Sequence, residues 1–238
     1  MSSEISWRLF SPAFTMKDTQ TSNDQPDSPA SSAGTEHSFT QVAHQALRDA
    51  RYIDRQLDGA ADQIIIAADD LDYAWTVTIA FLAQHEVREQ AGSSIVTTER
   101  DADAIERDFE RFLPDHRFGI LDLDADQQSR PYRDPPVHTL SNTGDFTSLF
   151  LTLDQIDSGF NGNSSLLVHS LDALVAETSV ETVTRLLKLF EWKHSATPQI
   201  FTLDLERCSD RSLENIRSVV DTLIRIEGAP DGTWITVE

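Results

Sequence analysis

Short, continuous apolar runs alternate along the chain with longer segments in which apolar residues recur at every third or fourth position. The run at residues 63–67 has the length and continuity of a strand that is buried on both faces of a sheet. Residues 41–57 place their apolar side chains on one face of a helix. This pattern predicts strands at 63–67, 94–98, 118–123, 137–140, 164–169, 199–203, 222–226 and 233–237, and helices at 41–57, 73–89, 102–113, 145–156, 180–192 and 209–219.

The alternation of these elements indicates the fold class. Strands that alternate with helices of about 10–15 residues form βαβ units, whose strands pair in parallel. Right-handed crossovers then place helices on both faces of the sheet. We therefore expect a three-layer α/β/α domain with a mostly parallel central sheet, closed by an antiparallel hairpin of the last two strands. One residue marks each of the five strands expected in the parallel part: Ile64, Ile95, Ile120, Leu167 and Ile200.

The first 38 residues differ in composition from the rest of the chain. Residues 15–38 are mainly Ser, Thr, Asp, Gln and Pro, so they bury too little apolar surface to offset the entropy lost on ordering. We expect residues 1–38 to be a disordered tail and residues 39–238 to form the domain. Large apolar side chains within residues 6–14 form a candidate docking peptide: Trp7, Leu9, Phe10 and Phe14. The alternatives are a strand or turn that folds back onto the domain, and a tail without a role.

The chain is strongly acidic. Its 19 Lys and Arg residues face 40 Asp and Glu residues, the net charge is −21, and Lys occurs only at positions 17, 188 and 193. Because the acidity runs the whole length of the chain, it predicts a salt-adapted protein of haloarchaeal type, in which molar salt screens the self-repulsion. An acidic mesophilic protein is the alternative. Such a surface repels phosphate backbones, so direct binding of nucleic acid is not expected.

The expected location of the protein follows from three further sequence features. No apolar run reaches the roughly 18 residues that a membrane helix needs, so no membrane partner is expected. The first residues lack the basic region and long apolar run of a secretory signal. The lone Cys208 cannot form an internal disulfide, which suits a reducing compartment. We therefore expect a cytoplasmic protein.

Three segments carry a resemblance to a known family. They are the apolar run 64–67 with the later helical segment 79–82, the segment 164–174, and the segment 221–227. With the order of elements over residues 41–238, they resemble the RecA superfamily, most closely the KaiC-like and RadA-like ATPase domains of archaea. The resemblance implies a RecA-like fold and domains that assemble side by side. The chain looks like one of the small degenerate proteins of this type that haloarchaea carry.

The chain departs from that family at the phosphate-binding loop. A working loop reads G-x-x-x-x-G-K-[ST], because glycines let backbone N–H groups wrap the phosphates, Lys binds their charge and the hydroxyl binds Mg²⁺. The residues at these four positions are apolar or aromatic: Ala68, Tyr73, Ala74 and Trp75. Acidic residues lie between them: Asp69, Asp70 and Asp72. We expect residues 69–72 to form a turn in which Asp72 caps the helix that follows.

Two more positions of the family's site can be matched. His169 stands where the resemblance places the aspartate that orients the metal, and Glu99 matches the first glutamate that activates water. A single Glu after a strand is also typical of a solvated loop. The seven histidines form no H-x-x-x-H or H-E-x-x-H pair. We therefore expect no metal site, no cofactor and no catalytic residue.

These observations support three hypotheses. The first is a non-catalytic RecA-like or KaiC-like domain that acts as a regulatory or assembly partner through protein–protein interaction. Self-association, or pairing with an active relative, is implied by the resemblance. The second is an unconventional ATPase or nucleotide-binding protein, for which Glu99 is the support. The third is an acidic signalling adaptor that docks through residues 6–14.

Overall fold

The computed structural model describes residues 33–57, 63–85, 92–123, 129–160, 164–193, 197–228 and 233–238. The candidate docking peptide at residues 6–14 lies outside the described residues. The described helices are α1 (Ala33–Gln56), α2 (Leu71–His85), α3 (Ala102–Phe112), α4 (Phe146–Asp157), the 3₁₀ turn η2 (Ser158–Phe160), α5 (Leu171–Glu177), α6 (Val180–Lys193) and α7 (Asp210–Arg217). The strands are β1 (Gln63–Ala68), β2 (Gly92–Thr97), β3 (Arg117–Asp122), β4 (Val137–Thr139), β5 (Ser164–Val168), β6 (Gln199–Asp204), β7 (Thr222–Glu227) and β8 (Trp234–Val237).

The described strands form one eight-stranded sheet in the order β4-β3-β2-β5-β6-β1-β7-β8. Every neighbouring pair of strands is parallel except β7 and β8, which pair antiparallel. Parallel pairing follows from crossover connections, which contain a helix between most consecutive strands. The predicted mostly parallel sheet with an antiparallel pair at its C-terminal end is confirmed.

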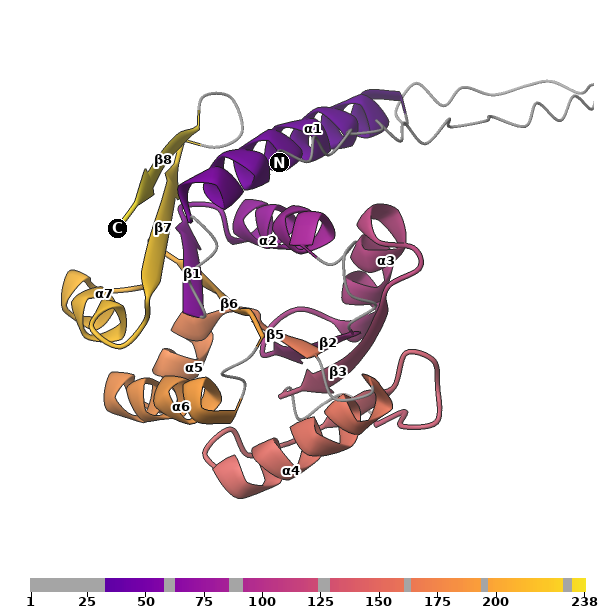
Figure 1. Ribbon diagram of the computed structural model, residues 1–238, viewed down its shortest axis with the longest axis vertical. Helices are drawn as coiled ribbons and strands as arrows, with labels where there is room; N and C mark the ends of the chain where they lie inside the picture. The colour runs from indigo at the N-terminus through magenta and orange to yellow at the C-terminus, as the bar shows by residue number, and fades with distance from the viewer. Residues whose placement is uncertain are drawn as a thin grey trace, which may run out of the picture.

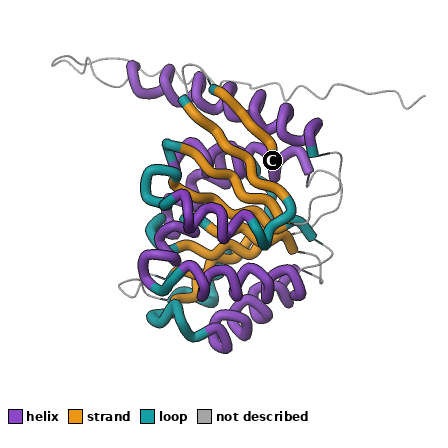
Figure 2. The backbone as a smooth tube through the Cα atoms, turned by 90° about the vertical axis from the view of Figure 1, so that its left-hand side faces the viewer, coloured by secondary structure: helices purple, strands orange, loops and turns teal. Residues whose placement is uncertain are grey.

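Helices cover both faces of this sheet (Figures 1 and 2). On one face, α1, α2 and α3 pack over the sheet, and on the other face lie α4, α5, α6 and α7 (Figure 1). The side chains of β1 alternate between the two cores, with Ile64 and Ile66 in the first core and Ile65 and Ala67 in the second. Burying each Ile stabilises the fold by about 1.5–3 kcal/mol, so both cores hold the central strands in place.

The element boundaries differ from the prediction at a few positions. Helix α1 begins at Ala33, well before the start predicted at residue 41. Helix α2 begins at Leu71, so the turn expected over residues 69–72 is confined to Asp69 and Asp70. The short helix α5 was not expected. None of the helices in the described ranges combines the length and apolarity needed to cross a bilayer.

Candidate functional site

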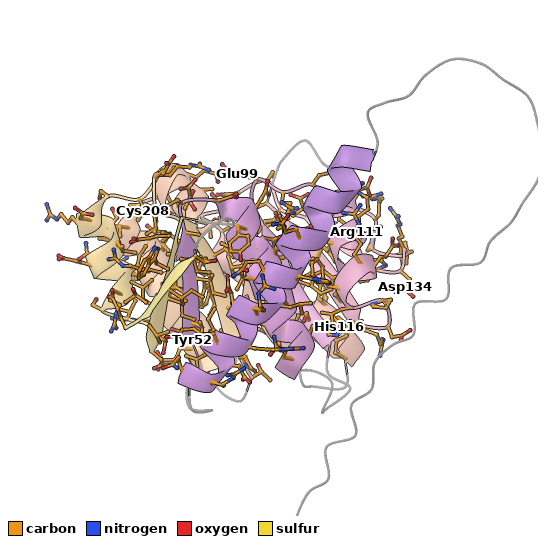
Figure 3. All side chains as sticks on the ribbon, turned by 90° about the horizontal axis from the view of Figure 1, so that it is seen from above. Tyr52, Glu99, Arg111, His116, Asp134 and Cys208 are labelled. Atoms are coloured by element: carbon orange, nitrogen blue, oxygen red, sulfur yellow. The ribbon has the colours of Figure 1, made fainter. Side chains whose placement is uncertain are left out.

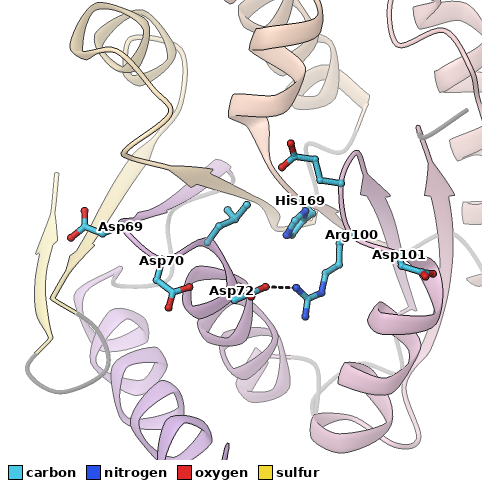
Figure 4. A pocket seen from close by; sticks show the side chains of 8 residues that line it. Asp69, Asp70, Asp72, Arg100, Asp101 and His169 are labelled. Carbon is cyan, nitrogen blue, oxygen red and sulfur yellow. Dashed lines mark hydrogen bonds and ion pairs between the residues drawn. The ribbon is translucent and has the colours of Figure 1, made fainter. Parts of the chain in front are cut away.

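The carboxyl ends of β1, β2 and β5 meet at one edge of the sheet, and a cleft of about 620 Å³ opens there (Figure 4). In open α/β sheets this edge is where ligands bind. Figure 3 shows Glu99 and Cys208 toward this end of the molecule, and Tyr52 and His116 toward the opposite end. The residues that line the cleft are Asp69, Asp70, Leu71, Asp72, Glu99, Arg100, Asp101 and His169. The structure thus brings together five of the residues singled out from the sequence: Asp69, Asp70, Asp72, Glu99 and His169.

The connection from β1 to α2 consists of Asp69 and Asp70 alone. The Oδ1 atom of Asp70 accepts a hydrogen bond from the backbone N–H of Tyr73 (3.1 Å), and its carbonyl accepts one from the N–H of Ala74 (3.0 Å). Asp70 therefore caps α2, and the expectation that Asp72 does so is wrong. Because helix begins at Leu71, these two N–H groups are already used within the chain and do not surround an open loop.

The residues at the family's glycine, lysine and hydroxyl positions belong to the core instead of the cleft wall. Tyr73 and Trp75 are 2% and 1% exposed, and Ala74 is fully buried. The hydroxyl of Tyr73 donates to Oδ2 of Asp49 on α1 (2.6 Å), and burial and that carboxylate raise the pKa of Tyr73. The indole Nε1 of Trp75 donates to Oδ2 of Asp108 on α3 (3.1 Å). These side chains fasten α2 to its neighbouring helices.

Arg100 is a residue of the site for which the sequence analysis assigned no role. Its Nη1 contacts Oδ1 of Asp72 (2.5 Å) across the cleft, drawn as a dashed line in Figure 4. Its Nε and Nη2 both donate to Oδ2 of Asp108 (3.1 and 2.7 Å). The guanidinium also lies 5.9 Å from the centre of the Trp75 ring, within cation–π range. Arg100 thereby joins the start of α2 to the middle of α3.

Glu99 is held by a second arginine. Both of its carboxylate oxygens accept hydrogen bonds from Arg207, at 2.6 and 2.7 Å, and Oε2 also accepts one from Ser170 Oγ (3.2 Å). The Arg207 guanidinium holds the pKa of Glu99 below its usual range, although partial burial opposes this shift. The Nε atom of Arg207 also lies 3.2 Å from Oδ2 of the buried Asp172. Glu99 is therefore a paired carboxylate and a weak proton acceptor.

His169 occupies the end of β5 and is 3% exposed. Its backbone is fixed, because its N–H donates to the carbonyl of Val96 (2.8 Å) and its carbonyl accepts from Thr98 Oγ1 (3.3 Å). Neither ring nitrogen has a hydrogen-bond partner among the described residues. The ring lies edge-on to Trp75, with 5.3 Å between centroids. Burial, aided by the nearby Arg100 charge, lowers the pKa of His169 to about 4, so the imidazole is neutral at pH 7.

The residue after His169 has an uncommon backbone conformation. Ser170 has a φ of 66°, in the left-handed region that costs an L-residue about 1 kcal/mol or more. Its N–H donates to Thr202 Oγ1 (3.0 Å), and the turn leads directly into α5. Asp172, in the first turn of α5, accepts a hydrogen bond on Oδ1 from the backbone N–H of Asp204 (3.0 Å). These contacts fix the segment after β5 against β6.

The electrostatic balance of the cleft is negative. Five carboxylates and one guanidinium line it, and the neutral His169 adds no charge at pH 7. Within the described residues, no group of three or more His, Cys, Asp or Glu side chains is placed to hold a metal ion. Phosphate oxygens would meet repulsion from most of the cleft wall, since unit charges near a protein surface interact by about 4 kcal/mol at 4 Å before salt screening.

No protein-family model matches the sequence, and no curated protein matches it either. Solved structures do match. An uncharacterised protein of Pyrococcus horikoshii, solved in complex with an unknown peptide, is 14% identical with a TM-score of 0.50; the match covers 79% of this chain and 88% of that one. The chain shares the overall fold of that protein. Identities of this size show the fold alone, and the predicted α/β class with a mostly parallel sheet is confirmed.

Two more archaeal structures match over much of this chain. A KaiC-like protein of Pyrococcus horikoshii OT3 is 12% identical with a TM-score of 0.49, and the match covers 74% of this chain and 76% of that one. The flagellar accessory protein FlaH of Methanocaldococcus jannaschii is 13% identical with a TM-score of 0.47, over 78% and 80% of the two chains.

Proposed function

We propose that this chain is a non-catalytic RecA-like domain that acts as a regulatory or assembly partner through protein–protein interaction. The observation that carries the proposal is the connection from β1 to α2. It has two residues, both acidic, and the N–H groups of Tyr73 and Ala74 already bond to Asp70. A phosphate-binding loop needs free N–H groups and a lysine, and the buried Ala74 supplies neither.

The state of Glu99 supports the same proposal. A general base needs a carboxylate that is free to accept a proton, with a pKa near the operating pH. The pKa of Glu99 is lowered, and both of its oxygens are occupied by Arg207. His169, at the position of the family's metal-orienting aspartate, presents a neutral ring where a carboxylate would bind Mg²⁺.

An interaction role is supported by the outer surface of the second helical layer. Leu151 on α4 and Leu189 and Trp192 on α6 are 58%, 40% and 82% exposed. The two helices contact each other through the ion pair of Lys193 with Asp154, and large apolar side chains exposed on adjoining helices are candidates for an interaction surface. The solved protein of this fold that carries a peptide adds support for a protein partner. Self-association is part of the proposal.

We also propose that the protein is cytoplasmic and adapted to high salt, as haloarchaeal proteins are. Its support is the net charge of −21, which molar salt screens, and the single cysteine. We expect the melting temperature to rise steeply from dilute buffer to molar KCl, because repulsion between carboxylates then weakens. A melting temperature that is independent of KCl would contradict this part of the proposal.

The proposal is tested by phosphate release from MgATP in molar KCl, with the native mass of the protein measured in the same buffer. We expect no saturable release, and the same background for the wild type and for Glu99→Gln. A native mass above that of the 26.6 kDa chain would support self-association. Saturable hydrolysis that Glu99→Gln abolishes would overturn the proposal.

A nucleotide-binding protein without hydrolysis is the second candidate. The observation that favours it is the cleft itself, since its volume of about 620 Å³ lies at the edge where open α/β sheets bind nucleotides. A binding titration with MgATP in the same buffer separates the two candidates, because saturable binding without phosphate release would select this one.

A further inference from the structure

A second cavity, of about 270 Å³, lies at the edge of the sheet opposite the acidic cleft, between the start of β3 and the end of α4. Its apolar wall combines core side chains with two prolines of the loop before β4: Phe118, Ile156, Phe160, Pro131 and Pro136. Sites for drug-sized ligands have volumes of about 300–1,000 Å³. This β3–α4 cavity is smaller, so it suits a group of the size of one large side chain.

The β3–α4 cavity also presents polar groups that the fold does not use. His138 and Gln155 line it, and neither side chain has a hydrogen bond with a described residue. Burial lowers the pKa of His138, so its ring is neutral at pH 7 and offers one acceptor nitrogen. Apolar walls with a free acceptor at the rim suit an indole, which is a large apolar ring with one N–H donor.

One wall of the β3–α4 cavity is held in place by Arg117. Its Nη2 donates a hydrogen bond to the carbonyl of Gly159 (2.9 Å), and its guanidinium lies 5.7 Å from the centre of the Phe160 ring. These contacts join the start of β3 to the turn after α4. The cavity is therefore part of the folded domain, with a shape fixed by packing and by this hydrogen bond.

Negative charge lies directly beside the β3–α4 cavity. A neighbouring hollow of about 290 Å³ shares Arg117, Phe118 and Asp134 with it. Three exposed carboxylates of that hollow have no hydrogen bond or ion pair with a described residue: Glu110, Asp115 and Asp134. A segment that places an aromatic ring in the cavity and a basic residue next to it would match both hollows in shape and charge.

The chain itself contains such a segment. Residues 5–17 include no Asp or Glu and carry Arg8 and Lys17, although the net charge of the whole chain is −21. Trp7 directly precedes Arg8 within the candidate docking peptide at residues 6–14. In an extended segment neighbouring side chains point in opposite directions, so two adjacent residues can enter two adjacent hollows.

The length of chain before α1 allows this segment to reach the cavity of its own domain. Residues 8–32 join Trp7 to the start of α1 at Ala33. Fully extended, a segment of that length spans about 80 Å. A compact domain of this size has a radius of gyration of only about 16 Å. The start of α1 also lies on the same side of the molecule as Arg111 and Asp134 (Figure 3).

We propose that the indole of Trp7 occupies the β3–α4 cavity of its own chain, where its N–H donates to the ring of His138 and Arg8 lies beside Asp134. The aromatic residue and its basic neighbour fit the two hollows together, which neither Phe10 nor Phe14 does because no basic residue adjoins them. The inference goes beyond the proposed function. It implies that a partner with an aromatic anchor can enter this cavity only when Trp7 leaves it.

The test uses the full chain with fluorotryptophan in molar KCl, and a soluble nitroxide broadens the fluorine NMR signals of exposed rings. The chain supplies its own references, because Trp75 is 1% exposed and Trp192 and Trp234 are 82% and 77% exposed. The loss of one signal in Trp7→Phe identifies the signal of Trp7. We expect this signal to be protected like that of Trp75. Broadening as strong as that of Trp192 would overturn the inference.

A variant that fills the cavity locates the contact. Gly159 lines the cavity, and a Cβ placed on it would meet no atom within 4 Å, so Gly159→Leu adds a side chain without a clash. We expect Trp7 to lose its protection in this variant. The matched control is Gly144→Leu, in the turn before α4, where the nearest atom to a Cβ is Oδ1 of Asn142 at 3.4 Å. Full protection of Trp7 in Gly159→Leu would overturn the inference.

A charge exchange tests the placement of Arg8. We expect Arg8→Glu to weaken the protection of Trp7, because it brings a carboxylate beside Asp134, and Arg8→Glu/Asp134→Arg to restore it. Molar KCl shortens the Debye length to about 3 Å, so only direct contacts contribute. Unchanged protection in Arg8→Glu, or no recovery in the double variant, would overturn this pairing.

A mixing experiment shows whether Trp7 binds its own chain or a second copy. Fluorinated Gly159→Leu has an intact segment and a filled cavity, and unlabelled Trp7→Ala has a free cavity. We expect the Trp7 signal to stay broadened in the mixture, and protection there would overturn the assignment to the same chain. An exposed Trp7 leaves the non-catalytic proposal intact, and MgATP hydrolysis, which would overturn that proposal, does not change the protection of Trp7.

Discussion

Two neighbouring connections at the same edge of the sheet use their acidic residues in opposite ways. After β1, Asp70 caps α2, and Asp69 beside it is exposed and has no ion pair with a described residue. After β2, Asp101 caps α3 in the same manner, but its neighbours Glu99 and Arg100 are tied into ion pairs. The local fold is therefore alike, and the difference lies in which charges are neutralised. The first connection supplies free negative charge, and the second supplies rigidity.

The largest loss of stability is expected from Trp75, which packs the helix after the first connection, α2, into the core. Trp75→Ala removes a fully packed indole between Phe109, His169 and Asp108, and should lower the free energy of unfolding by about 3–5 kcal/mol. Urea unfolding in molar KCl measures it. The control Trp192→Ala truncates an indole that is 82% exposed and should cost no more than about 0.5 kcal/mol. Equal costs would show that Trp75 is not the anchor.

A smaller loss of stability is expected when the ion pairs of Arg100 are removed. Arg100→Met keeps the apolar stem but removes the contacts to Asp72 and Asp108, and should cost about 1–2 kcal/mol, because Asp108 is mostly buried. Arg211→Met, at an exposed position on α7, is the control and should be close to neutral. If both variants unfold at the same urea concentration, Arg100 contributes no rigidity to the second connection.

The two helix caps provide the most direct comparison. Asp70→Ala and Asp101→Ala should each cost about 1 kcal/mol in molar KCl, and Asn at either position should restore most of that loss. In dilute buffer Asp70→Ala should cost less than Asp101→Ala, because it also relieves repulsion from Asp69 and Asp72. Urea unfolding at both salt concentrations measures this. Equal costs in dilute buffer would mean that the first connection carries no excess of free charge.

The smallest effect is a dependence on pH. The folded-state pKa of Glu99 lies below its unfolded value, mainly because of Arg207, so the pair stabilises the fold above the unfolded pKa. That contribution is lost as pH falls through the folded pKa. Because both side chains are about 40% exposed, it amounts to about 0.5–1 kcal/mol. Glu99→Gln should flatten this part of the unfolding curve, while the opposite contribution of Asp172, whose pKa burial raises, remains. The measurement is the free energy of unfolding as a function of pH for both proteins. If the wild type and Glu99→Gln show the same pH dependence, the ion pair makes no such contribution.

The fold could be predicted because its signals are local. Continuous apolar runs such as the one at Ile64–Ile66 must be buried on both faces, and the alternation with helices then leaves few topologies. The resemblance to the RecA superfamily grouped Asp69, Glu99 and His169 into one site, and the structure places all three at one cleft. The start of α2 was predicted two residues too late, at residue 73, because three nearby aspartates could each cap the helix and Asp72 was chosen.

The partners within the site could not be predicted. Arg207 meets Glu99 from 108 positions away in the sequence, and Asp108 meets Trp75 from another helix. Nothing in the local pattern around Arg207 distinguishes it from the other exposed arginines of an acidic chain. Such pairings follow from the packing of the helices against the sheet, which hydrophobic periodicity does not specify.

The sheet's two outer strands have a consequence for how copies of this chain could associate. β4 has three residues, and its outer side already exchanges two backbone hydrogen bonds with Arg130, at 2.6 and 3.2 Å. β8 has four residues and ends the sheet on the other side. A strand from another molecule would gain few backbone hydrogen bonds at either edge of the sheet. The short edge strands therefore disfavour aggregation by edge-to-edge pairing of sheets. Any association of copies would therefore use the helical layers and not the strand edges.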